Sequence, residues 1–242
     1  MPVSFYKMFG YPTGLGALLA RRDALARLKR PWFSGGTVVA ANIQGEMVVP
    51  LTGHALFEDG SVNYLGIPAI EIGLQHIERI GIGTISQRVE LLGTWLIGAL
   101  EGLRHSDGST AARIYGPTTW DRRGATISFN FLHPDGSVVD ERFVDVVAAA
   151  HDISVRTGCF CNSGAGETAF SISKDTLIGA EFSEGMILDD YIKLIGMPTG
   201  GAVRVSLGLA TNFADVYRFM HFATQFRDVG GIPDGLPPRL AC

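Results

Sequence analysis

Residues Val155–Asn162 read Val-Arg-Thr-Gly-Cys-Phe-Cys-Asn, and the fold and chemistry of the chain are best inferred outward from this stretch. Two of the three cysteines stand one residue apart, after an apolar strand ending and a glycine that permits a tight turn. Arg156 and the open amides of such a turn favour the thiolate, which is the reactive form of cysteine. The stretch therefore predicts a reactive thiol at a turn that follows a strand.

Composition limits the classes of protein to consider. The chain has 242 residues, 46% hydrophobic and 18% charged, which is enough apolar material for one globular domain or two small ones. A net charge of −4 without a basic run argues against a nucleic-acid partner. No apolar stretch reaches the roughly 20 residues needed to cross a bilayer, and Met1–Ser4 lacks the features of a signal peptide. Three cysteines make no disulfide framework, so we expect a cytoplasmic protein.

Hydrophobic periodicity predicts the elements of the first part. Gly14–Ala20 is expected to be a strand buried on both faces, and Thr37–Ala41 a second strand. Apolar residues at helical spacing predict helices over Ile67–Ile80 and from Ile85 to Leu103. Residues 1–65 thus supply one or two buried strands without a full set of neighbours.

The second part alternates strands and helices. We expect strands at Ala111–Tyr115, Thr126–Leu132, Ile153–Arg156 and Ala202–Leu207, and helices at Glu141–His151, Gly185–Ile195 and Phe213–Phe226, with little regular structure between Arg156 and Phe182. This order predicts an α+β layer with a mainly antiparallel sheet and helices on one face. We expect residues 1–105 and 106–229 to form two domains and residues 230–242 an irregular tail.

Lys7 and the cysteine pair each have two interpretations. A lysine near a terminus is usually a solvated surface group, but Phe5, Phe9 and Tyr11 would lower its pKa and favour Schiff-base chemistry. Buried cysteines are often small hydrophobes, and a Cys-x-Cys pair can be half of a metal site. The nearest histidine to Cys161 is His151, so we expect no metal. A lysine amine and a thiolate together indicate pyridoxal-phosphate chemistry on a sulfur-bearing substrate.

Arg204 lies mid-strand between Val203 and Val205. It could simply point to solvent. The alternative is a bidentate clamp on a substrate carboxylate.

Three segments in order carry a family resemblance. Ser4–Gly14, Arg156–Asn162 and Val203–Gly208 resemble the class V aminotransferase family, and within it the cysteine-desulfurase-like domains of molybdenum cofactor sulfurases. The resemblance runs from Val3 to about Phe226. It implies a mixed α/β and α+β chain, with part of the large pyridoxal-phosphate-binding domain of a fold-type I transferase followed by the small C-terminal domain.

The resemblance also implies roles for individual residues. Lys7 would bond to pyridoxal phosphate, and Ser4 and Tyr6 would bind its phosphate. Ser61 would reach the cofactor phosphate of a partner subunit in a homodimer. Cys161 would carry a persulfide, and Arg204 would bind the substrate carboxylate. L-cysteine is the implied substrate, and an acceptor would receive the sulfur.

The same resemblance raises two alternatives. Another class V reaction would leave Cys161 as a bystander. In the family, roughly half of the large domain precedes the lysine, so the chain could also be a non-catalytic fragment that needs a missing N-terminal half. We expect residues 111–226 to be well packed and residues 1–65 to be exposed, loosely ordered or covered by another chain.

Overall fold

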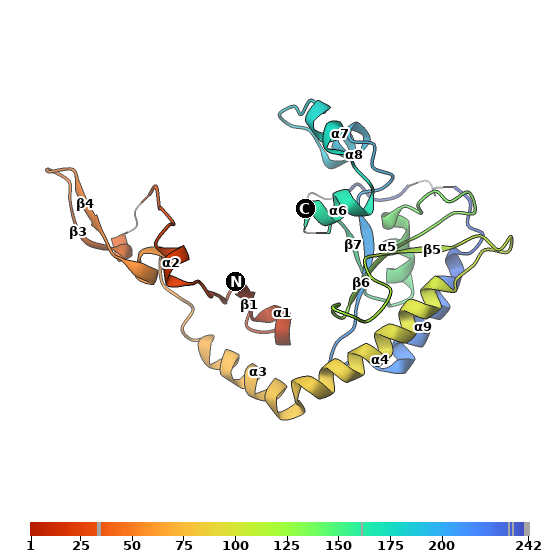
Figure 1. Cartoon of the computed structure of the whole chain (residues 1–242), viewed down its shortest axis with the longest axis horizontal. Helices are drawn as coiled ribbons and strands as arrows, with labels where there is room; N and C mark the ends of the chain where they lie inside the picture. Colours follow the sequence, from red (N-terminus) through yellow and green to blue (C-terminus); the bar gives the residue numbers. More distant parts are fainter. Residues whose placement is uncertain (33–34, 161, 232, 234, 240–242) are drawn as a thin grey trace. The chain divides into compact units, whose positions relative to one another are not determined.

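The structure is a computed structural model that describes residues 1–32, 35–160, 162–231, 233 and 235–239. The chain divides into two compact units, Met1–Ile82 and Gly83–Cys242, which we call the lysine unit and the cysteine unit (Figure 1). The lysine unit contains β1 (Pro2–Ser4), α1 (Tyr6–Phe9), β2 (Gly16–Leu18), α2 (Arg22–Leu25), η1 (Gly35–Thr37), β3 (Val38–Asn42), β4 (Met47–Pro50), η2 (Gly53–Phe57) and α3 (Ile67–Ile80).

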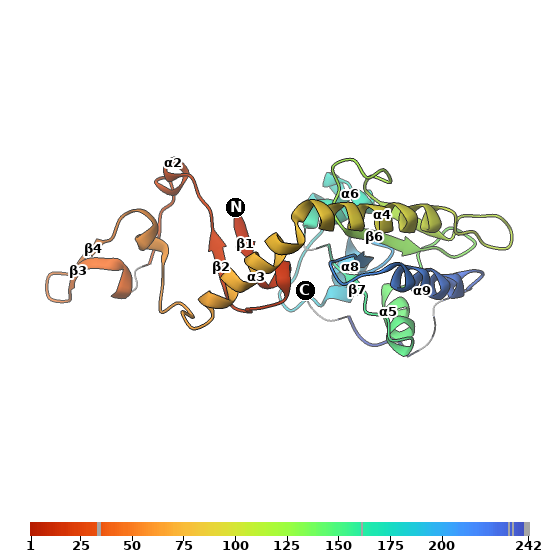
Figure 2. The same cartoon turned by 90° about the horizontal axis from the view of Figure 1, so that it is seen from below.

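Two separate ribbons supply the strands of the lysine unit. β1 pairs antiparallel with β2, and β3 pairs antiparallel with β4 (Figure 2). A two-stranded ribbon leaves both of its faces open, and every residue of β2 is exposed. The prediction of a strand buried on both faces at Gly14–Ala20 is therefore wrong, because the only strand that pairs with β2 among the described residues is β1.

The lysine unit has a small interior. Among its described residues, Pro12 and Leu15 are the buried ones with aliphatic side chains. α1 packs on α3 through Phe9, whose ring occupies the space that a side chain at Gly73 would need: a Cβ there would lie 2.4 Å from the ring. Stability from burial grows with the apolar area removed from water, so little of it is available here.

The cysteine unit contains a four-stranded sheet. Its elements are α4 (Ile82–Glu101), β5 (Ala112–Tyr115), β6 (Thr126–Phe131), α5 (Glu141–Ala150), β7 (Arg156–Gly158), α6 (Ser163–Ala169), α7 (Lys174–Gly179), α8 (Leu188–Leu194), β8 (Ala202–Ser206), α9 (Phe213–Ala223) and η3 (Thr224–Phe226). The strand order is β5-β6-β8-β7, and every neighbouring pair is antiparallel. The predicted antiparallel sheet is confirmed.

One face of this sheet carries the core. Ile127 and Phe129 of β6 stand opposite Val205 and Val203 of β8, and all four side chains are buried. They pack in one cluster with buried residues of α4, α5 and α9, helices that lie together with β6 in Figure 2. Phe131 stacks on Phe226 with ring centroids 4.2 Å apart. The helices therefore cover the face that the alternation of β6 predicts to be apolar.

The region after β7 differs from the sequence prediction. The strand predicted at Ile153–Arg156 lies at Arg156–Gly158, and the short helices α6 and α7 occupy the segment expected to be irregular. Both helices begin at side-chain caps: Asn162 accepts from the amide of Ala165, and Ser173 accepts from the amide of Thr176. Such short capped helices show no periodicity that a sequence pattern could detect.

Among the described residues, no helix is both long and apolar enough to cross a membrane.

Candidate functional site

Lys7 lies in the second position of α1, directly after β1. Its side chain is exposed, and its Nζ lies 5.9 Å from the centre of the Tyr6 ring. Ser4 at the end of β1 is half-buried, and Tyr6 is exposed. The apolar enclosure expected around Lys7 is not observed, because Phe9 turns to Gly73 of α3 and Phe5 stacks on Phe9 at 6.4 Å. The amine is thus held on an anchored turn but remains accessible.

The backbone around Lys7 depends on two glycines. Gly10 ends α1 with φ 83°, a left-handed conformation that favours glycine. Gly16 faces Ser4 across the β1–β2 ribbon, where a Cβ would lie 2.6 Å from the carbonyl oxygen of Val3. Close pairing of these strands therefore requires glycine at position 16. The ribbon positions Ser4, Tyr6 and Lys7 within one short turn.

Ser61 lies in the loop between η2 and α3 and is exposed. It follows Gly60, whose φ is 68°. The side chain of Arg30, only 3% exposed, forms an ion pair with Asp59 at 2.5 Å and donates to Thr37 Oγ1 at 2.8 Å and to the carbonyl of Leu56. Sequence reasoning missed Arg30, since no local pattern links it to a loop 29 residues away. Arg30 holds the start of the loop that presents Ser61.

Arg204 lies at the centre of β8, on the face opposite the core. Its register partners are Ser128 on β6 and Arg156 on β7, and Ser128 in turn stands opposite Tyr115 on β5. Residues 115, 128, 204 and 156 therefore form one row across the four strands. Arg204 is half-buried and Arg156 is exposed, and neither side chain makes an ion pair or hydrogen bond with another described residue.

Two arginines opposite each other without acidic partners form a local excess of positive charge. Like charges directly opposite on neighbouring strands are destabilising, unlike the opposite-charge pairs that usually occupy such positions. Guanidinium groups bind carboxylate and phosphate through paired hydrogen bonds. The sequence interpretation gave Arg156 only an influence on the thiol, whereas the register places it beside Arg204.

The cysteine-bearing loop begins where this strand pair ends. Gly158 has φ 96°, as the predicted tight turn requires, and Cys159 after it is half-buried. Gly201, directly before β8, touches this turn so closely that a Cβ there would lie 1.9 Å from the carbonyl oxygen of Gly158. Cys159 lines two cavities, one of about 640 Å³ and one of about 350 Å³. Cys161, the residue expected to carry sulfur, lies outside the described residues.

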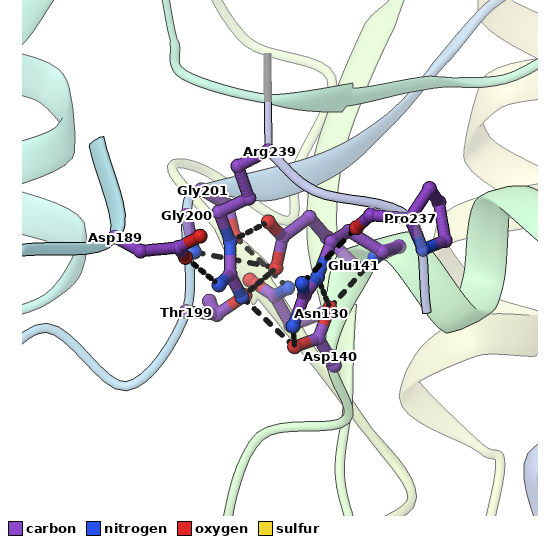
Figure 3. Close-up of polar contacts among 10 residues, drawn as sticks. Asn130, Asp140, Glu141, Asp189, Thr199, Gly200, Gly201, Pro237 and Arg239 are labelled. Atoms are coloured by element: carbon purple, nitrogen blue, oxygen red, sulfur yellow. Dashed lines mark hydrogen bonds and ion pairs between the residues drawn. The ribbon is translucent and has the colours of Figure 1, made fainter. Parts of the chain in front are cut away.

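A buried ionic cluster borders the larger cavity (Figure 3). Arg239 from the C-terminal tail donates to Glu141 at 2.7 Å, to Asp140 at 2.8 Å and to Asp189 at 2.5 Å. Glu141 is 3% exposed and also accepts from the hydroxyl of Thr199 and the amide of Gly200. Sequence reasoning treated this tail as irregular and missed Arg239, whose partner Glu141 is 98 residues away.

The electrostatics of the cluster follow from these contacts. Burial opposes the charged form of Asp140, but hydrogen bonds with Arg142 and the charges of Arg239 and Arg142 outweigh it and lower the pKa of Asp140. Burial also opposes the charged form of Arg239, but hydrogen bonds to Glu141 and Asp189 raise the pKa of Arg239 above its usual value. Asp140 and Arg239 are therefore ionised at neutral pH.

The residues predicted for the site fall into two groups. Ser4, Tyr6, Lys7 and Ser61 belong to the lysine unit, and Arg204 belongs to the cysteine unit. Within the cysteine unit the structure brings Arg204, Arg156 and the turn that leads to Cys159 together on two neighbouring strands.

Comparison with known proteins identifies the family. The family described as aminotransferase class V matches residues 1–219. The chain belongs to the class V aminotransferase family. Its curated relatives in this family include molybdenum cofactor sulfurases from Bos taurus, Solanum lycopersicum and Homo sapiens, at 38%, 38% and 36% identity. These matches cover 96%, 90% and 94% of this chain but 27%, 27% and 26% of the relatives, so the chain spans about a quarter of their length.

Solved structures of cysteine desulfurases show the same fold. The apo cysteine desulfurase of Thermococcus onnurineus matches with a TM-score of 0.62 at 23% identity, covering 93% of this chain and 46% of that one. A cysteine desulfurase of Escherichia coli matches with a TM-score of 0.62 at 16% identity, covering 93% of this chain and 45% of that one. The predicted fold, part of a fold-type I pyridoxal-phosphate-dependent enzyme, is confirmed.

Proposed function

We propose that this chain contributes the cofactor lysine, the carboxylate-binding arginine and the sulfur-carrying cysteine of a pyridoxal-phosphate-dependent cysteine desulfurase or sulfurase. One observation carries the proposal. Arg156 and Arg204 stand opposite each other, neither paired with an acidic side chain in the part of the chain that the structure describes, and the same strand, β7, leads within three residues to the cysteine-bearing loop. An anion-binding pair and a thiol on one strand pair suit a substrate that bears both a carboxylate and a sulfur atom.

The lysine unit offers groups that fit the cofactor. Lys7 presents an exposed amine on an anchored turn, and Ser4 and Tyr6 supply hydroxyl groups within three residues of it. An amine can bond to an aldehyde, and hydroxyl groups can donate hydrogen bonds to a phosphate. Ser61, on the loop held by Arg30, would supply a further hydroxyl across a homodimer. Pyridoxal phosphate, when bound, withdraws electrons from the substrate's Cα and so allows its bonds to break.

The residues of this chain would then divide the reaction among them. Arg204, with Arg156 beside it, binds the carboxylate of L-cysteine and orients the substrate. The Lys7 amine removes and returns the Cα proton. The Cys161 thiolate forms a bond to the substrate sulfur as the carbon–sulfur bond breaks, and that bond's electron pair stays with carbon, which gains a proton. The products are alanine and a Cys161 persulfide, whose outer sulfur passes to an acceptor.

Several partners follow from this proposal. The substrate is L-cysteine, the acceptor is a sulfur-accepting molecule, and the working assembly is a homodimer joined through the Ser61 loop. A persulfide is cleaved by thiols, so its lifetime in a reducing cytoplasm depends on prompt transfer. The low cysteine content of the chain favours a cytoplasmic location. In that setting, prompt transfer requires the acceptor to bind close to the cysteine-bearing loop.

The experiment is to incubate the purified chain with pyridoxal phosphate and L-cysteine, alkylate it, and locate persulfide by mass spectrometry while measuring alanine. We expect persulfide on Cys161 and an equal amount of alanine in the first turnover. Cys161→Ser should abolish both while it preserves the cofactor's visible absorbance, and Cys159→Ser should preserve persulfide formation. Amine transfer from cysteine without persulfide would instead support another class V reaction. If the chain gives no cofactor absorbance and forms no product, the proposal is contradicted.

A further inference from the structure

Three aromatic rings meet beneath the cysteine-bearing loop. Phe160, between the two cysteines, packs edge-to-face against Tyr115 of β5, with ring centroids 5.9 Å apart and planes at 73°. It packs the same way against Phe170 at the end of α6, at 5.9 Å and 74°. Tyr115 and Phe170 close the triangle at 5.6 Å and 67°. Edge-to-face contacts at these separations are the favourable geometry for aromatic pairs.

The triangle joins β5 to the residues that follow β7 and to the end of α6. Phe160 lies two residues after β7, whereas Phe170 follows the last residue of α6. Gly166 of α6 faces the Phe160 ring, and a Cβ there would approach the ring to 3.4 Å. Asn162, which caps α6, stands two residues after Phe160. Thus Gly166 and Phe170, within and at the end of α6, both lie against the Phe160 ring.

Tyr115 connects this triangle to the arginine row. Its register partner Ser128 is also the register partner of Arg204, so one line of side chains runs from the aromatic triangle to Arg204 and Arg156. The Tyr115 hydroxyl is buried without a hydrogen-bond partner among the described residues. Burial raises the pKa of Tyr115, partly opposed by the positive charge of Arg113. The ring, and not the hydroxyl, therefore makes the contacts that stabilise the triangle.

We infer that Tyr115 and Phe170 are positioning residues, which hold the Phe160 ring and so fix the cysteine-bearing loop at the end of the Arg156–Arg204 strand pair. This inference rests on the proposed function for the reaction step that it serves. Cys159 and Cys161 flank Phe160 in the sequence, so we expect that holding the Phe160 ring limits the motion of the thiols bonded on either side of it. Arg204 would bind the substrate carboxylate and so determine where the substrate sulfur lies. The attacking thiol must then be held in a fixed position, because misplacement by about 1 Å can cost two orders of magnitude in rate.

The first test measures thiol accessibility and requires neither cofactor nor substrate. The full chain is treated with limiting iodoacetamide, and the labelling rates of Cys159 and Cys161 are followed by mass spectrometry. Tyr115→Ala and Phe170→Ala should each remove two ring contacts and raise the labelling rates by roughly tenfold. Tyr115→Phe should leave them unchanged, because it keeps the ring.

A matched control comes from the same unit. Phe182 stacks on Tyr191 at 5.7 Å, outside the triangle, and Phe182→Ala should not alter the labelling rates. Hydrogen exchange at β6 and α4 verifies that each variant keeps its core. If Tyr115→Ala unfolds, then Phe170→Ala and Phe160→Leu decide the matter. Unchanged labelling in the folded variants, or an equal rise in Phe182→Ala, would overturn the inference.

The second test uses catalysis to separate positioning from general weakening. In sulfur transfer from L-cysteine, Phe170→Ala should lower kcat by roughly tenfold and leave KM unchanged, because Arg204 is intact. Tyr115→Phe should retain the wild-type kcat, whereas equal changes in kcat and KM would contradict a positioning role. The two proposals can fail separately. Absence of persulfide in the wild-type chain counts against the proposed function alone, and insensitive thiol labelling counts against the positioning residues alone.

Discussion

Arg204 and Arg156 show what single residues contribute here, because strand pairing places these two anion-binding side chains opposite each other. Val203 and Val205 turn into the core, so the alternation of β8 directs Arg204 to the opposite face. Antiparallel pairing then brings Arg156 directly opposite it. The sequence alone left Arg204 open to a purely solvated interpretation, since it does not specify which strand lies alongside.

Substitution of Arg204 tests this arrangement. Arg204→Lys keeps the charge but loses the paired hydrogen bonds, so the KM for L-cysteine should rise. The corresponding loss of binding free energy should lie near the lower end of the roughly 2–5 kcal/mol that loss of a desolvated charged contact costs. The cofactor absorbance should persist, because Lys7 is untouched. Arg122→Lys, at an arginine whose side chain is 91% exposed, is the control. An unchanged KM in Arg204→Lys would place this residue outside the substrate site.

Lys7 makes a second prediction at the scale of the residue. Reduction with borohydride in the presence of pyridoxal phosphate should fix the cofactor on Lys7, because its amine is exposed and the hydroxyl-bearing residues Ser4 and Tyr6 lie within three residues of it. Peptide mass spectrometry locates the adduct, and Lys7→Arg should abolish it. Lys29, Lys174 and Lys193 provide internal controls. An adduct spread evenly over Lys7 and these three lysines would contradict the assignment.

Periodicity predicted the long elements, whereas local caps and pairing determined the short ones. The helix containing Val89 and Leu96 and the alternating strand β6 both followed from residue spacing. α6 and α7 were missed because helices of seven and six residues have less than two full turns of pattern. The ends of β7 were misplaced because its three residues are selected by pairing with β8 rather than by hydrophobicity.

Arg239 of the C-terminal tail contacts Glu141 and Asp140, and this contact was the hardest to predict from the sequence. Its contribution to stability can be measured. Arg239→Met would leave Glu141 and Asp140 buried with less compensation, which should destabilise the cysteine unit by about 3–5 kcal/mol. Urea unfolding measures this loss. Arg122→Met, at an exposed ion pair with Asp121, should change little. Equal stability of Arg239→Met and the wild type would mean that the tail contact contributes nothing.

The same cluster predicts a pH dependence. The folded-state pKa of Asp140 lies below its usual value of 3.8. Its stabilisation should therefore be fully present above that value and decline as the pH falls through the lowered pKa. Arg142→Met removes the hydrogen bonds that Asp140 accepts from this side chain, so the mutant should lose less stability between pH 5 and acidic pH than the wild type does. Parallel pH profiles for the two proteins would contradict this cause.

At the scale of the whole molecule, the two units differ in how many of their apolar side chains are buried. The buried aliphatic and aromatic core runs from Val89 to Phe226, within the cysteine unit. The β3–β4 ribbon of the lysine unit instead exposes Val39 at 68% and Ile43 at 94%. Isolated two-stranded ribbons are marginally stable in water, and their open edges favour pairing with another chain. The sequence predicted this contrast because residues 1–65 lack neighbours for their strands.

Hydrogen exchange on the purified chain tests the contrast. Opening free energies follow buried contacts, so amides of β6, β8 and α9 should be strongly protected, whereas amides of β2, β3 and β4 should exchange almost as fast as in an unfolded peptide. If the proposed homodimer forms through the lysine unit, protection of that unit should rise with protein concentration while protection of the cysteine unit stays constant. Uniform strong protection from Met1 to Leu100 in a dilute monomer would show that the lysine unit is stable by itself and needs no second chain.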